Sequence, residues 1–185
     1  MNSIVFDGKK VCPSKIVCIG QNYMEHIKEL HNKVPKQPVI FIKPNSSISH
    51  DIFSSTDDLI HYESEISFLI ISNKIAGVGF GMDLTKREIQ SDLKSKGLPW
   101  ERAKAFDGAA VFSEFVTFEG NVRDLRMELS INGSLVQHGG YDLMLNKPDE
   151  ILHEALGFLS FEDGDIIMTG TPKAVSYTHL TLPTN

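Results

Sequence analysis

Two glutamates in one apolar segment are the residues of this chain best suited to chemistry. Residues 61–71 are rich in β-branched and aromatic side chains, which predicts a strand. Because side chains two positions apart on a strand point to one face, Glu63 and Glu65 present their carboxylates together. Adjacent carboxylates repel each other and are costly to bury, and Mg²⁺ or Mn²⁺ between them would remove that cost. The alternative is a solvated strand face on which both glutamates point into water.

Asp83 is a candidate for a third carboxylate of the same site. It ends the glycine-rich segment 75–83, whose alternating glycines leave one strand face open to close approach. The G-x-G-x-x-G spacing of dinucleotide-binding loops is absent. A helix is predicted over 85–96, with Thr85 and Glu88 as its capping box. At this junction Asp83 either favours the helix dipole or binds a metal ion.

Three other residues are candidates for proton transfer or substrate binding. His26 and Glu29 are three positions apart in a helix predicted over 21–30, with Asn22 as its N-cap, so they can meet on one helical face. An ordinary surface pair is the alternative for these two. Lys104 lies among alanine and phenylalanine, which favours a partly buried lysine over a solvated one.

Short strands and helices are predicted for the rest of the chain. Asn132-Gly133 between apolar segments is the strongest hairpin signal, and Asp7-Gly8 predicts a second turn. The hydroxyls and amides of residues 169–172 can hold a carboxylate. Strands are predicted over 15–20, 38–43, 114–118 and 166–168, a long loop over 44–60, and a helix over 148–160 with Leu152, Ala155, Leu156 and Leu159 on one face.

Composition limits the classes of protein that this chain can represent. Its 185 residues are enough for one domain with a sizeable core, and the net charge of −6 disfavours nucleic acid as a partner. No apolar segment is long enough to span a membrane, and the N-terminus lacks a signal-peptide pattern. Two cysteines do not form a disulfide framework. These features predict a soluble cytoplasmic protein.

Seven motifs in order resemble those of the fumarylacetoacetate hydrolase family, over residues 15 to about 173. Each motif alone is weak, but their shared order is a specific signal. The Gly-Leu-Pro-Trp motif, together with His26 and Glu29, is most similar to the acylpyruvase and oxaloacetate decarboxylase branch. The motifs are IGQNYxxHxxE (19–29), FIKP (41–44), YESE (62–65), GMDLT (81–85), GLPWxxAKxFD (97–107), INGxLVQ (131–137) and GDIIMTGTP (164–172).

The resemblance implies a fold, a metal site and a substrate class. The family fold is α+β, a mixed β-roll with peripheral helices, and its members are usually homodimers. Family members bind Mg²⁺ or Mn²⁺ through positions that correspond here to Glu63, Glu65 and Asp83. Three carboxylates leave about three of six octahedral positions open, and a small 2-oxo acid can fill two of them.

The resemblance also implies roles for the other candidates. His26, polarised by Glu29, would activate water, and Lys104 would hold the substrate or a developing oxyanion. The metal ion would stabilise the pyruvate enolate that forms when a C–C bond of an acylpyruvate or of oxaloacetate is broken. Substrate oxygens would be held by Gln137, Gly170 and Thr171.

The expected function is therefore a metal-dependent hydrolase or decarboxylase of small 2-oxo acids. One alternative is an isomerase or decarboxylase of 2-hydroxymuconate-type intermediates of aromatic degradation, which the same family includes. Another is a non-catalytic domain in which the metal ion only stabilises the fold. The presence of His26, Glu29 and Lys104 beside the three carboxylates favours an enzyme, because a structural metal site needs none of them.

The sequence departs from the family pattern after Pro172. Family members usually continue with x-Gly-Val-Gly and further strands that complete the roll, whereas residues 173–176 here read Lys-Ala-Val-Ser. The expected division is a catalytic domain over 1–175, lacking the last strands of the roll, and an atypical tail over 176–185 that is not an integral part of it.

Overall fold

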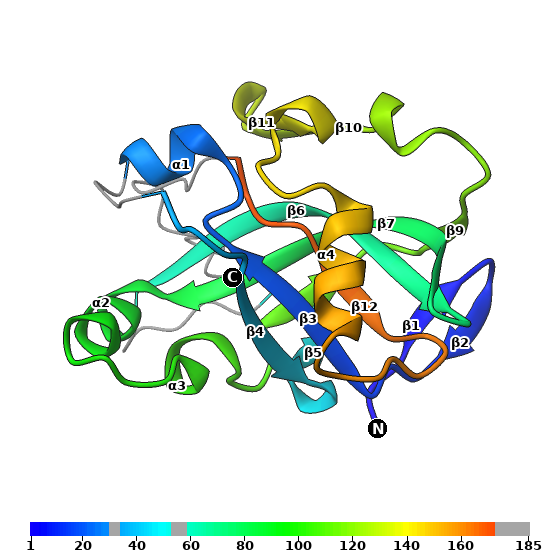
Figure 1. Cartoon of the computed structure of the whole chain (residues 1–185), viewed down its shortest axis with the longest axis horizontal. Helices are drawn as coiled ribbons and strands as arrows, with labels where there is room; N and C mark the ends of the chain where they lie inside the picture. Colours follow the sequence, from blue (N-terminus) through cyan, green and yellow to red (C-terminus); the bar gives the residue numbers. More distant parts are fainter. Residues whose placement is uncertain (30–33, 53–58, 173–185) are drawn as a thin grey trace.

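In the computed structural model, the described part of the chain comprises residues 1–29, 34–52 and 59–172. Its centre is a mixed sheet with the strand order β4-β3-β12-β6-β7-β8-β5, and β9 pairs with β7 (Figure 1). The pairs β12–β3 and β5–β8 are parallel and the others are antiparallel. This arrangement confirms the expected α+β class with a mixed sheet. The strands are β3 (Lys15–Gly20), β4 (Val39–Pro44), β5 (Ile48–Ser49), β6 (Ile60–Ile71), β7 (Lys74–Lys86), β8 (Ala110–Phe112), β9 (Val116–Thr117) and β12 (Ile166–Met168).

Two hairpins lie outside this sheet, β1 (Ile4–Phe6) with β2 (Lys9–Val11) and β10 (Arg126–Ile131) with β11 (Ser134–Gly140). Both turns have the residues that the sequence predicted. Asp7 and Gly8 have φ angles of 46° and 74°, and Asn132 and Gly133 have 51° and 78°. Positive φ at both central residues is the requirement of the tight turns that match strand twist, which explains why Asn-Gly and Asp-Gly occur there.

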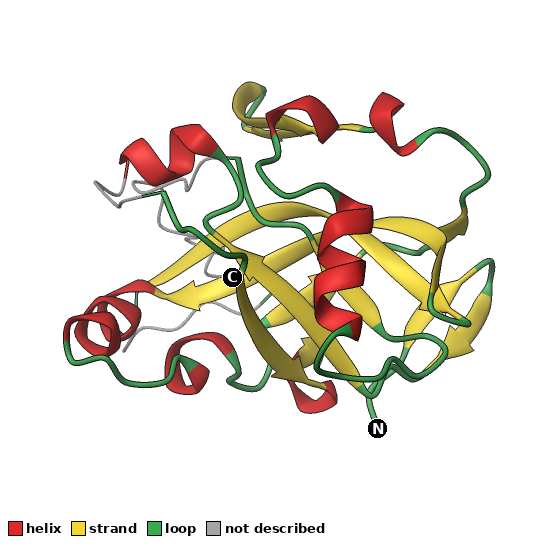
Figure 2. Ribbon diagram, viewed as in Figure 1, coloured by secondary structure: helices red, strands yellow, loops and turns green. Residues whose placement is uncertain are grey.

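Helices are few and short (Figure 2). Figure 1 shows α4 lying across the sheet over β3 and β12, where its Ile151, Leu152 and Ala155 join a core cluster with Val17 and Ile167. The pair α2 and α3 lies at one end of the long strands. The helices are α1 (Met24–Glu29), α2 (Arg87–Ser95), α3 (Glu101–Lys104) and α4 (Pro148–Leu156), with 3₁₀ turns η1 (Asn45–Ser47), η2 (Val122–Asp124) and η3 (Tyr141–Leu143).

The antiparallel pair β6–β7 is the longest element and carries the candidate site. Its apolar side chains enter different cores. Leu69 lies in one core with Met168 of β12, and Ile66 and Phe68 lie in another. The pairing places Glu63 opposite Asp83 and Glu65 opposite Gly81. Because the register of a strand is fixed when its faces are buried, the positions of these carboxylates are fixed by packing that is remote from them.

Several local predictions were wrong. The predicted helix over 85–96 begins at Arg87, because β7 continues to Lys86 and includes Thr85. The helix over 148–160 ends at Leu156, and this side chain is 37% exposed, whereas Ile151 is buried in its place. The predicted loop over 44–60 contains η1 and β5, and the strand predicted over 114–118 is shortened to β9.

The tail predicted over 176–185 lies outside the described residues, as do residues 173–175 of the predicted domain. Among the helices of the described residues, none has the length and apolar character needed to cross a bilayer.

Candidate active site

Glu63, Glu65 and Asp83 form one buried cluster of carboxylates. Their side chains have one carboxylate oxygen each within 4.8 Å of the others. The residues are 5%, 2% and 1% exposed, which excludes the solvated strand face that the sequence left open. The β6–β7 register produces the cluster, because it sets Asp83 directly across from Glu63.

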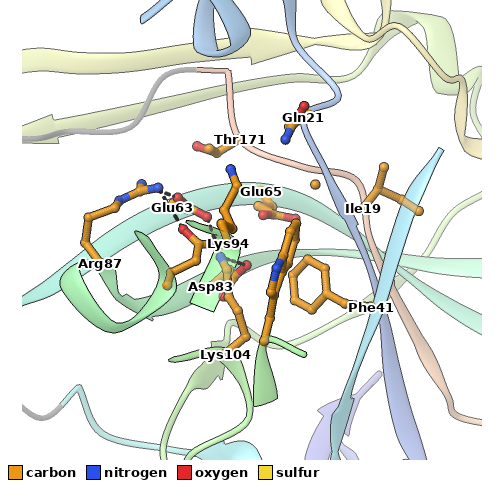
Figure 3. Close-up of a pocket in the computed structure, with 13 residues that line it drawn as sticks. Ile19, Gln21, Phe41, Glu63, Glu65, Asp83, Arg87, Lys94, Lys104 and Thr171 are labelled. Carbon is orange, nitrogen blue, oxygen red and sulfur yellow. Dashed lines mark hydrogen bonds and ion pairs between the residues drawn. The ribbon is translucent and has the colours of Figure 1, made fainter. Parts of the chain in front are cut away.

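Three cations surround two of the carboxylates. The Lys104 ammonium lies 2.7 Å from Glu63 Oε2 and 2.6 Å from Asp83 Oδ2, and it also donates to the Thr85 hydroxyl at 2.6 Å. Lys43 Nζ lies 2.8 Å from Asp83 Oδ1. An Arg87 guanidinium nitrogen lies 2.6 Å from Glu63 Oε1 (Figure 3). Burial alone would lower the pKa of Lys104, but the charges of Asp83 and Glu63 outweigh it and raise that pKa.

Glu65 lacks such a partner. No lysine or arginine of the described residues lies within ion-pair distance of it, and its Oε2 accepts a hydrogen bond from the Gly170 amide at 2.7 Å. Burial, followed by the negative charges of Asp83 and Glu63, raises the pKa of Glu65 well above its usual value. The cluster is therefore short of positive charge at this carboxylate.

The residues fit a bound divalent cation. Three carboxylates supply the hard oxygen donors that Mg²⁺ and Mn²⁺ prefer, and the uncompensated Glu65 gives a cation a reason to bind. The pocket that they line encloses about 30 Å³, room for an ion or for one water-sized group. A wider groove of about 410 Å³ adjoins it and shares Phe41, Trp100 and Lys104.

The predicted substrate-binding residues take different positions. Thr171 lines the pocket, and its hydroxyl accepts a hydrogen bond from Gln137 Nε2 at 3.0 Å. Gln137 lies behind it, where its carbonyl oxygen accepts from the amide and the hydroxyl of Ser64. The Gly170 amide donates a hydrogen bond to Glu65. The carboxylate held by residues 169–172 therefore belongs to a side chain of this protein. Of the three residues, Thr171 lines the pocket, Gln137 bonds to Thr171 from behind, and Gly170 bonds to Glu65.

His26 and Glu29 lie on α1, and their side chains are outside the described part of the structure. The start of that helix is anchored by Asn22. Its side-chain Nδ2 donates to the backbone oxygens of Asn146 and Thr169, each at 2.9 Å. Its side-chain oxygen accepts from the Asn146 amide at 2.7 Å. The prediction that Asn22 caps the helix was therefore wrong, because these bonds tie the start of α1 to the strand end that carries Thr171.

The role that the sequence predicted for Thr85 was also wrong. The sequence predicted a helix cap, but its hydroxyl is a ligand of the Lys104 ammonium inside the site. Because β7 continues to Lys86, Thr85 lies two positions after Asp83 on the same strand face.

Sequence reasoning missed several residues of the site. Lys43, which is fully buried, had a usable signal, because it lies at the end of the apolar segment 38–43. The others line the pocket from a turn, a strand, a helix and a loop, and their neighbours gave no such signal. They are Gln21, Phe41, Arg87, Gln90, Lys94 and Trp100.

Comparison with known proteins agrees with this geometry. Residues 15–183 match the family model of the fumarylacetoacetate (FAA) hydrolase C-terminal domain. The chain is 36% identical to oxaloacetate tautomerase FMP41, mitochondrial, of Saccharomyces cerevisiae, over 87% of this chain and 81% of the relative. It is also 36% identical to oxaloacetate tautomerase YcgM of Escherichia coli, over 88% and 82%.

A solved structure extends the likeness to three dimensions. Fumarylpyruvate hydrolase from Pseudomonas aeruginosa, in complex with Mn²⁺ and pyruvate, superposes with a TM-score of 0.84 at 24% identity, over 92% of this chain and 83% of that chain. At this identity the likeness concerns the fold. The family match and the two relatives, together with the mixed sheet that carries three buried carboxylates, show that this chain belongs to the fumarylacetoacetate hydrolase family.

Proposed function

We propose that this protein is a divalent-metal-dependent enzyme that interconverts the keto and enol forms of oxaloacetate or of a closely similar 2-oxo acid. The observation that supports this most is the buried cluster of Glu63, Glu65 and Asp83, in a chain 36% identical to two oxaloacetate tautomerases. Mg²⁺ or Mn²⁺ is the proposed ion, held by these three carboxylates. Negative charge accumulates on the oxo oxygen as the enol forms, and a divalent cation there supplies electrostatic stabilisation.

The chain's own residues would bind the substrate and move its proton. Lys104 stays protonated through its two carboxylate partners and keeps positive charge next to the oxygen that becomes negative. The Thr171 hydroxyl, oriented by Gln137, lies on the pocket wall and would hold a substrate oxygen. His26, oriented by Glu29, would transfer the proton at the carbon between the two carbonyl groups.

Hydrolysis or decarboxylation is the second candidate, as the sequence predicted. Both reactions develop the same negative charge on an oxo oxygen as enol formation does, so the carboxylates and Lys104 serve all three. They differ in the bond that breaks at the neighbouring carbon. The Mn²⁺ and pyruvate in the Pseudomonas structure support the metal and the 2-oxo acid group that all three reactions share.

One experiment separates these reactions. The enol form of oxaloacetate is followed by its ultraviolet absorbance in Mg²⁺ while released pyruvate is measured in parallel, and acetylpyruvate is tested in the same way. A tautomerase removes the enol absorbance without releasing pyruvate, a decarboxylase releases pyruvate from oxaloacetate, and a hydrolase releases it from acetylpyruvate. If the protein accelerates neither the enol conversion nor decarboxylation nor hydrolysis, the proposed function is wrong.

The same assay tests His26. His26→Ala is expected to lower turnover by about 10²–10⁴-fold while metal affinity is retained, since a general acid–base group contributes this much. His153→Ala, at an exposed position of α4, is the control and should leave turnover unchanged. Equal losses of turnover and of metal binding in His26→Ala would make His26 structural.

A further inference from the structure

We infer that Lys94 selects substrates that carry a second carboxylate, by forming an ion pair with the carboxylate distal to the 2-oxo acid group. The inference rests on the proposed function and narrows its substrate class to 2-oxo dicarboxylic acids. Neither the sequence motifs nor the roles of the carboxylates point to Lys94, and the structure places it in the pocket wall (Figure 3).

The position of Lys94 on α2 directs it to the site. Arg87, Gln90 and Lys94 are spaced three and four residues apart, so they share one face of the helix, and all three line the pocket. Its ammonium lies 5.6 Å from the centre of the Trp100 ring, which forms another part of the same wall. A cation over an aromatic face is held in place without being neutralised.

Among the described residues, Lys94 is the cation of this wall without an ion-pair partner. Lys104 and Arg87 both form ion pairs with Glu63, whereas the ammonium of the half-buried Lys94 makes no hydrogen bond or ion pair with any described residue. Burial, followed by the charge of Arg87, lowers the pKa of Lys94, and the opposing charge of Glu63 does not outweigh them. A half-buried cation of this kind is stabilised when a ligand brings a carboxylate to it.

The charge balance of the site also favours a dianionic substrate. Three carboxylates face four cationic side chains, Lys43, Lys94, Lys104 and Arg87, so the site has a net formal charge of about +1 before a metal ion binds. A divalent cation raises this charge further. The 2-oxo acid group brings one negative charge, and a distal carboxylate brings a second one to the side where Lys94 is unpaired.

Lys96 shows what a lysine of this helix end looks like when it is only a surface residue. Its side chain is 58% exposed and lies 2.8 Å from the Asp92 carboxylate, one turn back. The two lysines are two residues apart, but Lys94 lines the pocket and has no carboxylate partner in the described part of the chain. Lys96→Met is therefore a matched control for Lys94→Met.

The test compares two ligands of similar size that differ in the distal group. Oxaloacetate ends in a carboxylate, and acetylpyruvate has an acetyl group in its place. Trp100 is the single tryptophan and lies in the pocket wall, so its fluorescence reports occupancy next to Lys94. Rapid-mixing titrations in saturating Mg²⁺ give the dissociation constant of each ligand before turnover accumulates, for the wild type, Lys94→Met, Lys94→Arg and Lys96→Met.

The wild type and Lys96→Met are expected to bind oxaloacetate at least tenfold more tightly than acetylpyruvate. Lys94→Met should weaken oxaloacetate binding by about 10–100-fold, the range of a hydrogen bond to a charged group, and leave acetylpyruvate binding within about twofold. Lys94→Arg should restore most of the preference. A wild type without preference, or a Lys94→Met variant that keeps it, would overturn the inference.

These outcomes are independent of the proposed reaction. If neither acid is turned over but the preference for oxaloacetate exists and depends on Lys94, the proposed function fails and the inference about Lys94 stands. If oxaloacetate is turned over and Lys94→Met keeps the preference, the proposed function stands and the inference fails.

Discussion

Glu65 is the residue on which the proposed metal site depends most. Glu63 and Asp83 have lysine and arginine partners that neutralise them without a metal ion, and Glu65 has the Gly170 amide. The unfavourable charge of the unloaded cluster is therefore concentrated at Glu65. A divalent cation relieves it, and a proton relieves it too, so metal ions and protons should compete at this carboxylate.

The first prediction concerns the pH dependence of stability without metal. Because the folded-state pKa of Glu65 is raised, the stability that its protonation provides is fully present below the usual glutamate pKa and is lost as pH rises through the folded pKa. In EDTA the melting temperature of the wild type should therefore fall as pH rises in this window. Glu65→Gln should melt higher than the wild type at pH 8 and lose this part of the pH dependence.

Added Mg²⁺ should reverse the order of the two proteins. At about 100 times the dissociation constant, a ligand that binds only the folded state adds about 2.7 kcal/mol, and Glu65→Gln should gain none of it. Thermal unfolding with and without Mg²⁺ measures both effects. If EDTA melting curves of the wild type and Glu65→Gln have the same pH dependence, Glu65 does not carry this charge cost.

At the scale of elements, the site depends on how β6, β7 and the end of β12 are held. The β6–β7 register sets Glu63 against Asp83, and the segment after β12 returns past the start of α1, where Asn22 is bonded to it. Gly170 lies at this crossing with φ of 89°. Its amide is aimed at Glu65 because the backbone adopts a conformation that glycine accepts readily.

The second prediction is that Gly170→Ala is destabilising and weakens metal binding. An added Cβ would lie 2.9 Å from Asn22 Cβ and 3.0 Å from Ile19 O, at a left-handed φ. Strain of about 1 kcal/mol and overpacking of about 1–3 kcal/mol predict a total of about 2–4 kcal/mol in urea unfolding. Manganese affinity should fall with it, since the amide that orients Glu65 moves.

Gly97→Ala provides the control for backbone strain alone. Gly97 also has a left-handed φ of 64°, but an added Cβ there meets nothing within 4 Å. It should cost only about 1 kcal/mol and leave metal affinity unchanged. Equal effects of the two substitutions would mean that close packing at Gly170 is unimportant.

The sequence predicted elements better than their ends, for physical reasons. Strand β6 and the Asn132-Gly133 hairpin follow from local side-chain patterns and turn chemistry, and both were correct. The predictions that Asn22 and Thr85 cap helices were wrong, because both side chains bond to residues that are distant in sequence. No local pattern shows that an asparagine or threonine is needed elsewhere in the fold.

The same reasoning applies to the site. The two glutamates share a face by strand geometry alone, so their pairing was predictable, but bringing Asp83 opposite Glu63 required the β6–β7 register. Lys94 and Arg87 reach the site through the position of α2 against the sheet, which is set by tertiary packing.

At the scale of the whole molecule, a partly buried ion pair joins segments from the two ends of the chain. Asp165, at the start of β12, accepts from the Ser14 amide at 2.7 Å and lies 2.5 Å from Lys15 Nζ at the start of β3. The parallel pairing of β3 and β12 begins next to this contact. Burial would raise the pKa of Asp165, but its bonds to Lys15, Glu162 and Ser14 outweigh burial and lower it.

The third prediction is that Asp165→Asn destabilises the fold by about 2 kcal/mol, the range of charge-assisted hydrogen bonds. Because the folded-state pKa of Asp165 is lowered, its contribution is present above the usual pKa of about 3.9 and is lost as pH falls below it. Urea unfolding at pH 7 and at pH 3 should show the difference shrinking in acid. Asp107→Asn, at an exposed position, is the control, and a constant difference at both pH values would contradict the assignment.

The central claim is that the buried carboxylates of Glu63, Glu65 and Asp83 hold one divalent cation. Electron paramagnetic resonance measures it directly, because the six-line signal of free Mn²⁺ is lost when the ion binds. Titration of the metal-free protein should give one Mn²⁺ per chain for the wild type and for the exposed control Glu154→Gln, and none for Glu65→Gln. A wild type that binds no Mn²⁺, or a Glu65→Gln variant that binds it as the wild type does, would contradict the account.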